Sequence, residues 1–396
     1  MNLHYKTAAL LTAIALLLPL TSCTMRETYD RNPAESSLTD DGDAGLKVAE
    51  KVNSVEIGTT DGTPTGLDST APDGTTGEEK TVTVALAGDI KLSAAMINDA
   101  HAQAAEGKEY SFLRMYTGAY RALNDTDISV GMYSSVGQPY GTEADYEPPT
   151  EHIDALSALG FDVLDISGMG SDYTRLNERD IDGISSDEES SSAVRTVEVG
   201  QMKLSFVSCG CDDTLAQCCY SDDFIKLLED SDGGCDSLIV LVHWDKDMAA
   251  EEKREAVMPL IEAGADVIVG DGETIETIEL VTTGSDEDEN AKEALVCYSL
   301  GNLLSDANEA VNLVSGILTL TYTEDGAALP DEAVAVPTFV HYEVNESGTR
   351  ANYAIYRAVD YTAELAHLHP AEVDPDGLKN YINSVIPSDY LPEEYR

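Results

Sequence analysis

Positive charge is scarce in this 396-residue sequence. It contains 23 lysine and arginine residues against 74 aspartate and glutamate residues, which gives a formal net charge of −51 at pH 7. Binding to nucleic acid depends on clustered Lys and Arg side chains that neutralise phosphates, and the sequence has no such cluster. The composition therefore excludes a nucleic-acid partner. The acidity is typical of a solvated, self-repelling surface, although grouped carboxylates also suit hard divalent cations.

Long apolar segments are also scarce, and only the N-terminus approaches one. Lys6 precedes an apolar stretch at 7–20, which has the length of a signal-peptide core and falls short of the roughly 20 residues of a spanning helix. The segment 20–23 resembles the lipobox of a bacterial lipoprotein. We expect residues 1–23 to be a lipoprotein signal peptide and Cys23 to carry the lipid that anchors an extracytoplasmic protein to the bacterial cell membrane. A signal peptide with an incidental cysteine is the alternative.

Large apolar residues are few between residues 24 and 79, which are rich in Thr, Ser, Asp, Gly and Pro. Such a segment cannot bury enough surface to offset the entropy of ordering, so we predict a disordered acidic stalk. Residues 80–363 are long enough for one large domain. Residues 364–396 are predicted to be a C-terminal extension with one short amphipathic helix at 375–385.

Six cysteines follow Cys23, and an even number in an exported protein favours disulfides. The cysteines expected to pair are Cys209, Cys211, Cys218, Cys219 and Cys235. Cys297 lies within an apolar strand pattern and is expected in the core. Free buried thiols and a soft-metal site are the alternatives, although the cysteine spacing matches no zinc pattern.

The hydrophobic periodicity indicates strands that alternate with helices, followed by a strand-rich second half. The strands expected first are at 81–87, 127–132, 161–166, 194–199, 202–208, 238–242 and 266–269, and the later ones at 276–282, 293–299, 313–322, 335–343 and 351–358. Helices are expected at 93–105, 110–123, 153–159, around 224–228 and at 249–263. This order favours an α/β fold with mixed sheets, whose sites lie where the parallel strands end.

Five short segments occur in the order and spacing of one known family. They are 84–89, 158–164, 242–244, 263–270 and 298–302. Together they resemble the capsule synthesis protein CapA family, which is associated with poly-gamma-glutamate capsule and looks related to calcineurin-like metallophosphatases. The resemblance implies a metallophosphatase-like four-layer αββα sandwich with mixed sheets.

The resemblance also identifies which site residues are retained. Asp89 matches the Gly-Asp that ends the family's first strand, His243 matches its His-Trp-Gly motif, and Asn302 matches its Ser-Leu-Gly-Asn motif. These three are interpreted as vestiges of the family site. Trp244, Asp271 and Glu273 are candidates for the rim of the same pocket.

Most of the other ligands that the family pattern implies are replaced. Met132 and Ser134 stand where the family has Asn-x-Glu, Gly168, Met169 and Gly170 stand where it has Asn-Asn-His, and Asp271 to Thr274 replace its Gly-His-His-Pro-His loop. A two-metal phosphoesterase centre needs a shell of His, Asp and Asn ligands. We therefore predict no catalytic and no metal-binding residue. A divalent cation on Asp271 and Glu273 is a cofactor that the sequence leaves open.

Each retained residue also has a structural interpretation. Asp89 would cap a helix that begins near Ser93. His243 would be a satisfied interior histidine, and Asn302 would belong to a turn. His367 and His369 have metal-like spacing but lie near the chain's end.

The sequence predicts a surface-anchored CapA-like lipoprotein, without catalytic activity, that assembles or binds an envelope polymer. Its expected partners are the membrane, through the N-terminal lipid, and an envelope polymer or capsule assembly proteins. A metal-dependent hydrolase with a rebuilt carboxylate-rich site is the alternative. A structural surface protein whose acidic coat is its function is the third hypothesis.

Lipid anchoring is directly testable at Cys23. The Cys23→Ala variant should leave its precursor unprocessed or release the protein from the membrane, because the only anchor is the lipid. Fractionation and precursor size measure both effects. Unchanged processing and membrane association of the variant would remove the anchoring hypothesis.

Overall fold

The computed structural model describes residues 80–136, 148–167, 174–186, 193–210, 220–245, 248–284, 290–323 and 328–396. The predicted signal peptide, Cys23 and the predicted stalk lie outside these residues. Among the helices of the described part, none is long and apolar enough to cross a membrane.

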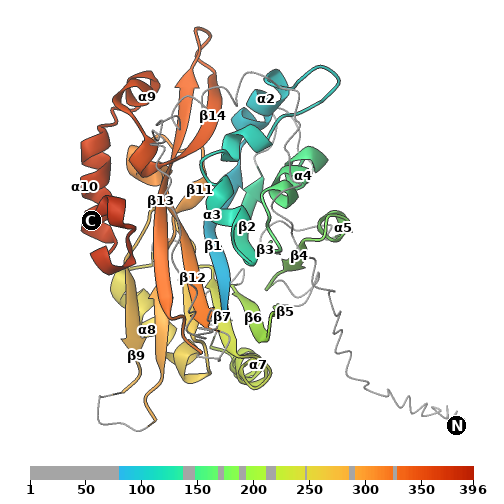
Figure 1. The fold of residues 1–396 in the computed structure, drawn as a ribbon, viewed down its shortest axis with the longest axis vertical. Helices are drawn as coiled ribbons and strands as arrows, with labels where there is room; N and C mark the ends of the chain where they lie inside the picture. The colour runs from blue at the N-terminus through green and yellow to red at the C-terminus, as the bar shows by residue number, and fades with distance from the viewer. Residues whose placement is uncertain are drawn as a thin grey trace, which may run out of the picture. The chain divides into compact units, whose positions relative to one another are not determined.

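Two mixed β-sheets form the centre of the structure (Figure 1). The first is eight-stranded, with the order β14-β13-β12-β1-β2-β3-β4, and β11 pairs with β1 beyond this path. Its strands are β1 (Thr81–Leu92), β2 (Ile128–Val136), β3 (Val163–Asp165), β4 (Asp182–Ile184), β11 (Asn302–Leu304), β12 (Val314–Thr323), β13 (Glu332–Val344) and β14 (Arg350–Arg357). The run β11-β1-β2-β3-β4 is parallel, and the run from β1 to β14 is antiparallel.

The second sheet is six-stranded, with the order β5-β6-β7-β8-β10-β9. Its strands are β5 (Val194–Val199), β6 (Met202–Cys209), β7 (Ser237–Val242), β8 (Val267–Gly270), β9 (Ile278–Thr282) and β10 (Glu293–Cys297). Its four central strands are parallel, and its two edge strands are antiparallel to their neighbours. The two sheets confirm the predicted α/β class with mixed sheets.

Successive residues along the strands of the second sheet belong to two different apolar cores, so this sheet lies between two apolar layers. Ile239 and Leu241 of β7 belong to the main core, together with residues of the first sheet, whereas Val240 and Val242 belong to a second core under helices α7 (Asp222–Asp232) and α8 (Ala250–Glu262). Successive residues of a strand point to opposite faces, so β7 is buried on both. The hydroxyls of Ser237 and Tyr322, 3.3 Å apart, join the two sheets directly.

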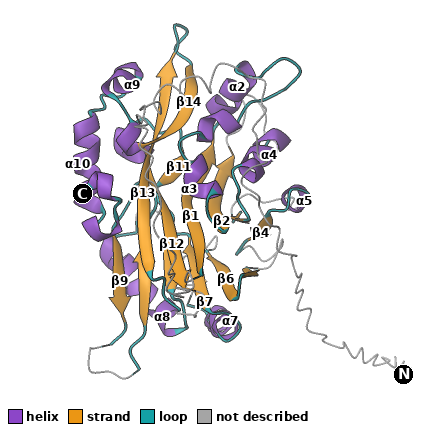
Figure 2. Cartoon of the chain, viewed as in Figure 1, coloured by secondary structure: helices purple, strands orange, loops and turns teal. Residues whose placement is uncertain are grey.

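Helices also cover the outer side of the first sheet (Figure 2). They are α2 (Ala94–Ala102), α3 (Tyr120–Asn124), α4 (Thr150–Ala158) and α5 (Thr174–Asn177), with 3-10 turn η1 (Leu113–Tyr116). The order helix, sheet, sheet, helix is that of the expected αββα sandwich. The remaining 3-10 turns of the described chain are η2 (Ala310–Leu313), η3 (Ala358–Asp360), η4 (Ser388–Tyr390) and η5 (Glu393–Tyr395).

The C-terminal residues pack beside β13. They form α9 (Ala363–Leu368) and α10 (Pro375–Val385), the latter with the bounds predicted from the sequence. Asp374 caps α10 by accepting hydrogen bonds from two backbone amides. Ile382, Ile386 and Tyr395 are buried in the main core, so the segment after residue 363 contributes to the same core as the sheets.

An aspartate stands immediately before four of the parallel strands and fastens each to its neighbour. Asp127, Asp162, Asp236 and Asp266 each accept a hydrogen bond from an amide near the start of the adjacent strand, at 2.7–2.9 Å, and donate their own amide to the carbonyl of that same residue. We call these paired bonds the aspartate clasps. They fix strand register, which explains why Asp follows Gly-Phe at 162 and Gly-Ala at 266.

Several predicted elements differ from the structure. The first strand runs on to Leu92, because β11 and β2 both pair with it beyond Gly88. Ser93 caps α2 by accepting the Met96 amide, so the interpretation of Asp89 as the helix cap is wrong. The helix expected at 110–123 is split by Gly118, whose amide donates to the Ile355 carbonyl of β14.

The clasps predict a graded loss of stability. Asp162 is only 6 % exposed, so Asp162→Ala should lower the free energy of unfolding by about 1–3 kcal/mol by leaving the buried Ser129 amide without an acceptor. Asp162→Asn retains an acceptor and should lose less. Urea denaturation measures this, with Asp127→Ala at the exposed clasp as the control. Equal losses in Asp162→Ala and the control would contradict the role of the buried clasp.

Candidate functional site

The register of four parallel strands, β11, β1, β2 and β3, brings one residue of each into a row. Asp89 of β1 is the register partner of Asn302 on one side and of Met132 on the other, and Met132 is the partner of Asp165 in β3. Of these residues, Asp165 stands at the carboxyl end of its strand, where α/β proteins place their sites. The row therefore contains two of the predicted vestigial positions, Asp89 and Asn302, with one residue, Asp165, that was not predicted.

His243 and Asp271 reach this row from the second sheet, where they follow β7 and β8. His243 Nε2 lies 3.1 Å from Asp165 Oδ2, and His243 Nδ1 lies 3.0 Å from Asp271 Oδ2. One imidazole thus joins carboxylates that come from both sheets. We call Asp165, His243 and Asp271 the inter-sheet bridge.

The environment of the bridge holds the imidazole in its charged form. Burial favours neutral imidazole, but the charges and hydrogen bonds of Asp165 and Asp271 outweigh it and raise the pKa of His243 well above its ordinary value of 6.5. Burial likewise favours the neutral acid at Asp165, but the charge and hydrogen bond of His243 prevail and lower the pKa of that carboxyl below its ordinary 3.8. The bridge is therefore an imidazolium held between two carboxylates.

Local contacts fix both Asp165 and the His243 ring. Asp165 Oδ1 accepts the Ser167 amide at 3.0 Å, and the Ser208 hydroxyl is a further hydrogen-bond partner of the carboxylate. Ser167 and Ser208 are joined through their hydroxyls at 2.8 Å. Gly210 lies under the imidazole, where an added Cβ would come within 2.9 Å of His243 Cβ. The fully buried carboxylate is thus supplied with donors, as a buried charge requires.

Trp244 supports Asp271. Its amide donates to Asp271 Oδ1 at 3.0 Å, and its indole Nε1 donates to the Tyr298 carbonyl at 2.7 Å. The indole passes so close to Gly270 that a Cβ there would lie 2.0 Å from Nε1. Lys253 Nζ lies 5.4 Å from the indole centroid. Trp244 therefore anchors the start of the loop that carries Asp271.

Asp89 and Asn302 are held together by the backbone of β11. The Asp89 amide donates to the Gly301 carbonyl at 2.9 Å, and Gly301 has a φ of +68°, a conformation that favours glycine. Asp89 is 1 % exposed, and Lys91 Nζ lies 3.6 Å from its Oδ2. Asn302 Nδ2 donates to the Glu273 carbonyl at 3.3 Å. These contacts place Asn302 between β1 and the loop after β8.

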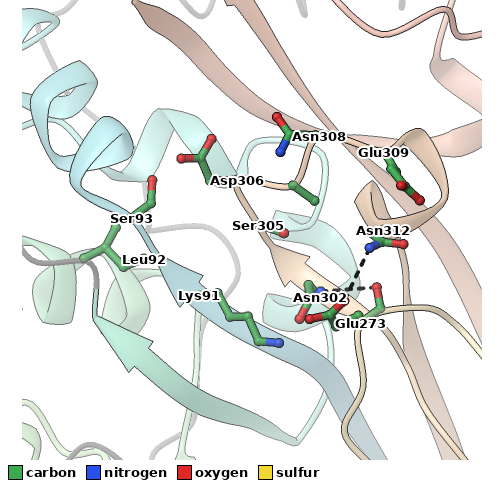
Figure 3. A pocket seen from close by; sticks show the side chains of 11 residues that line it. Lys91, Leu92, Ser93, Glu273, Asn302, Ser305, Asp306, Asn308, Glu309 and Asn312 are labelled. Carbon is green, nitrogen blue, oxygen red and sulfur yellow. Dashed lines mark hydrogen bonds between the residues drawn. The ribbon is translucent and has the colours of Figure 1, made fainter. Parts of the chain in front are cut away.

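A polar pocket of about 480 Å³ opens beside Asn302 (Figure 3). It is lined by Lys91, Leu92, Ser93, Glu273, Asn302, Ser305, Asp306, Ala307, Asn308, Glu309 and Asn312. Of the predicted site residues, Asn302 and Glu273 line this pocket, whereas Asp89, His243, Trp244 and Asp271 are not among its lining residues. The candidate residues therefore lie in three places: a row across the parallel strands, the inter-sheet bridge and this pocket.

These residues do not fit the two-metal centre that the family resemblance implies. A histidine ligates a metal through the lone pair of a neutral ring nitrogen, but both nitrogens of His243 face carboxylates in the bridge. Met132, a poor ligand for hard ions, lies between Asp89 and Asp165. No cluster of three or more His, Cys, Asp or Glu side chains suited to a metal occurs within the described ranges. The replaced positions Gly168, Met169 and Gly170 lie outside those ranges, as does the side chain of Ser134.

Asp165 is the functional residue that the sequence reasoning missed. It stands in a short, fully buried strand, between Leu164 and Ile166. An ionisable residue inside an otherwise apolar strand is rarely buried without a partner. That departure from the apolar pattern at 161–166 was the available signal.

The cysteines and the C-terminal histidines also have defined positions. Cys209 is disulfide-bonded, whereas Cys235 and Cys297 are free. The free thiol of Cys235 departs from its expected pairing, because it lies in the turn before β7 and contacts the Asp232 carbonyl. Cys211, Cys218 and Cys219 lie outside the described residues.

His369 packs on the Tyr342 ring at 4.6 Å, and burial lowers the pKa of His369 to about 4, which is typical of a core residue.

Comparison with known proteins identifies the family. The model of the bacterial capsule synthesis protein family PGA_cap matches residues 83–307, so the chain belongs to that family. This confirms the family that the sequence motifs indicated. No curated protein matches the chain.

Three solved structures are similar to the chain at low identity. A novel phosphatase from Mycoplasma pneumoniae has 10 % identity and a TM-score of 0.42, covering 66 % of this chain and 94 % of its own. A hypothetical protein from Thermus thermophilus has 14 % identity and a TM-score of 0.38, covering 69 % and 98 %. A putative 5'-nucleotidase from Staphylococcus aureus has 9 % identity and a TM-score of 0.37, covering 77 % and 59 %. These similarities carry no argument about activity.

The bridge predicts a defined dependence of stability on pH. Because the folded pKa of His243 is raised, its contribution is complete below about pH 6.5 and is lost as the pH rises through the folded value. Because the folded pKa of Asp165 is lowered, its contribution is complete above about pH 3.8 and is lost as the pH falls through the folded value. At pH 7, His243→Gln should cost about 3–5 kcal/mol, because Asp165 is left as an unpaired buried charge.

Urea denaturation of both proteins between pH 3 and pH 10 measures this dependence. Asp271→Asn is the control. It should lower the free energy of unfolding less than His243→Gln does, because it leaves the fully buried Asp165 paired with His243 and changes a side chain that is 19 % exposed. A His243→Gln variant as stable as the wild type at pH 7, with the same pH dependence, would show that the bridge carries no stability.

Proposed function

We propose that this chain is a surface-anchored, catalytically inactive member of the capsule synthesis family that takes part in assembling or binding an envelope polymer. The lipid on Cys23 holds it at the outer side of the bacterial cell membrane, and the segment before residue 80 separates the domain from the bilayer. Its partners are an envelope polymer or the proteins that assemble a capsule. Family membership supports the polymer-related role.

The observation that carries the inactive assignment is the double engagement of His243. Its two ring nitrogens face Asp165 and Asp271 at 3.1 and 3.0 Å, and the ring is positively charged in that setting. An imidazolium repels a metal ion and has no lone pair to offer. The bridge therefore uses the one histidine retained from the family pattern for an internal ion pair.

The charge of the chain constrains how a polymer is held. A net charge of −51 repels an anionic polymer over distances up to the Debye length, about 8 Å at physiological salt. Direct contact then requires a bridging cation or a polymer segment that is not anionic. The pocket beside Asn302 offers a concave surface for such contact, since most of the residues that line it are polar.

A metal-dependent hydrolase with a rebuilt carboxylate-rich site is the second candidate. Asp89 and Asn302 remain register partners in the first sheet, and the exposed Glu273 lies in the loop that meets Asn302. Such oxygen ligands suit Mg²⁺ or Ca²⁺ better than a transition metal.

Metal analysis and hydrolysis assays of the purified full-length protein decide between the two candidates. We expect no stoichiometric Mn, Fe or Zn and no hydrolysis of bis(p-nitrophenyl) phosphate above background, with or without added Mn²⁺ or Mg²⁺. The variants Asp89→Ala and His243→Ala should leave both readouts unchanged, as should the control Asp127→Ala at the opposite strand ends. The hydrolase would be established if about two metal ions co-purify with the protein, and if Asp89→Ala and His243→Ala, but not Asp127→Ala, abolish both metal binding and hydrolysis.

A further inference from the structure

The positive charge in the lining of the pocket beside Asn302 is already paired with a carboxylate. Lys91, the one cation among its lining residues, lies 3.6 Å from the Asp89 carboxylate. Asp306 is paired with Arg350 and accepts the Tyr353 hydroxyl at 2.5 Å. Two other acidic residues line the pocket, Glu273 and Glu309, and both are exposed. The pocket therefore presents net negative charge to an entering ligand.

A buried acceptor faces the same pocket. Asn302 is 2 % exposed, and its Oδ1 has no hydrogen-bond partner among the described residues. The orientation of this amide is fixed, because Nδ2 donates to the Glu273 carbonyl and only the amide nitrogen can do so. A buried amide oxygen without a donor costs free energy, and a ligand that brings an N–H or O–H group removes that cost. Figure 3 places Asn302 in the pocket wall between Lys91 and Glu273.

These two features select the chemistry of the ligand. Glu273 accepts a hydrogen bond from Asn312, and neither Glu273 nor Glu309 has a cationic partner among the described residues. Acceptors and such carboxylates favour a ligand that is rich in donors and positively charged. Most of the other wall groups are hydroxyls and amides, from Ser93, Ser305, Asn308 and Asn312, which suit the hydroxyl groups of a ligand. Leu92 and Ala307 add apolar surface, which suits the carbon skeleton of such a ligand. The volume of about 480 Å³ lies within the range of small-ligand sites.

We propose that this pocket binds an amine-bearing polyol, an amino-sugar unit carrying a free ammonium group. The ammonium lies against Glu273 and Glu309, and an O–H or N–H group of the sugar donates to Asn302 Oδ1. Lys91 donates to a ring or hydroxyl oxygen. This inference rests on the proposed polymer-binding role and narrows it, because it makes the recognised segment cationic rather than anionic.

Isothermal titration of the purified full-length protein with small sugars tests the proposal. At a pH where the amine is protonated, glucosamine should bind at least tenfold more tightly than N-acetylglucosamine, which lacks the charge, and glucuronate should not bind. Asn302→Ala should weaken glucosamine about tenfold, the loss of one hydrogen bond. Glu309→Gln, at an exposed position where folding is not at risk, should weaken it by a similar factor. Glu255→Gln on the outer helix α8 is the matched surface control and should leave binding unchanged.

Three outcomes would overturn the proposal. Equal binding of glucosamine and N-acetylglucosamine would remove the ammonium from the recognition. Binding of Ca²⁺ or Mg²⁺ that is lost in Asn302→Ala and competes with glucosamine would make the pocket a cation site. Absence of glucosamine binding would reject the pocket's assignment alone, because the metal and hydrolysis assays test the inactive role independently.

Discussion

A charged imidazole between two carboxylates is the interaction on which the candidate site depends. Asp165 ends β3 in the first sheet, and His243 and Asp271 follow β7 and β8 in the second, so the bridge ties together the carboxyl ends of both sheets. The same protein contains a contrasting case. The ring nitrogens of His152 face the hydroxyls of Tyr116 and Tyr133, and burial lowers the pKa of His152 to about 3. Carboxylate partners, not burial, decide the charge of His243.

The bridge gives the retained family residues a structural role in place of metal binding. In a metal centre, buried carboxylates are compensated by the ions they ligate. Here the compensation of Asp165 comes from His243, and the aspartates of the Gly-Phe-Asp and Gly-Ala-Asp segments, Asp162 and Asp266, are occupied by their clasps. The family framework thus persists through interactions that need no metal.

Much of the fold could be predicted from the sequence, because it depends on local patterns. The buried strands of the second sheet are continuous apolar runs, and α10 has a strong amphipathic period and an Asp cap. The full length of β1 could not be predicted, since its last residues pair with β11, which lies more than 200 positions later. Nor could β4, a three-residue edge strand with one large apolar residue. In the site, Asp89, His243 and Asn302 carried a motif signal, whereas Asp165 carried only its departure from an apolar strand pattern. The partner of Asp165 in the other sheet is known only from the contact itself.

The charge state of His243 is the most direct test of this account. Nitrogen-15 NMR of the protein with isotope-labelled histidine side chains at pH 8 reports whether each ring nitrogen carries a proton. We predict that both nitrogens of His243 are protonated at that pH, that those of His152 show a neutral ring, and that Asp165→Asn returns His243 toward the neutral form. A neutral His243 at pH 8 in the wild type, with one unprotonated nitrogen whose signal shifts on addition of Zn²⁺, would contradict the account.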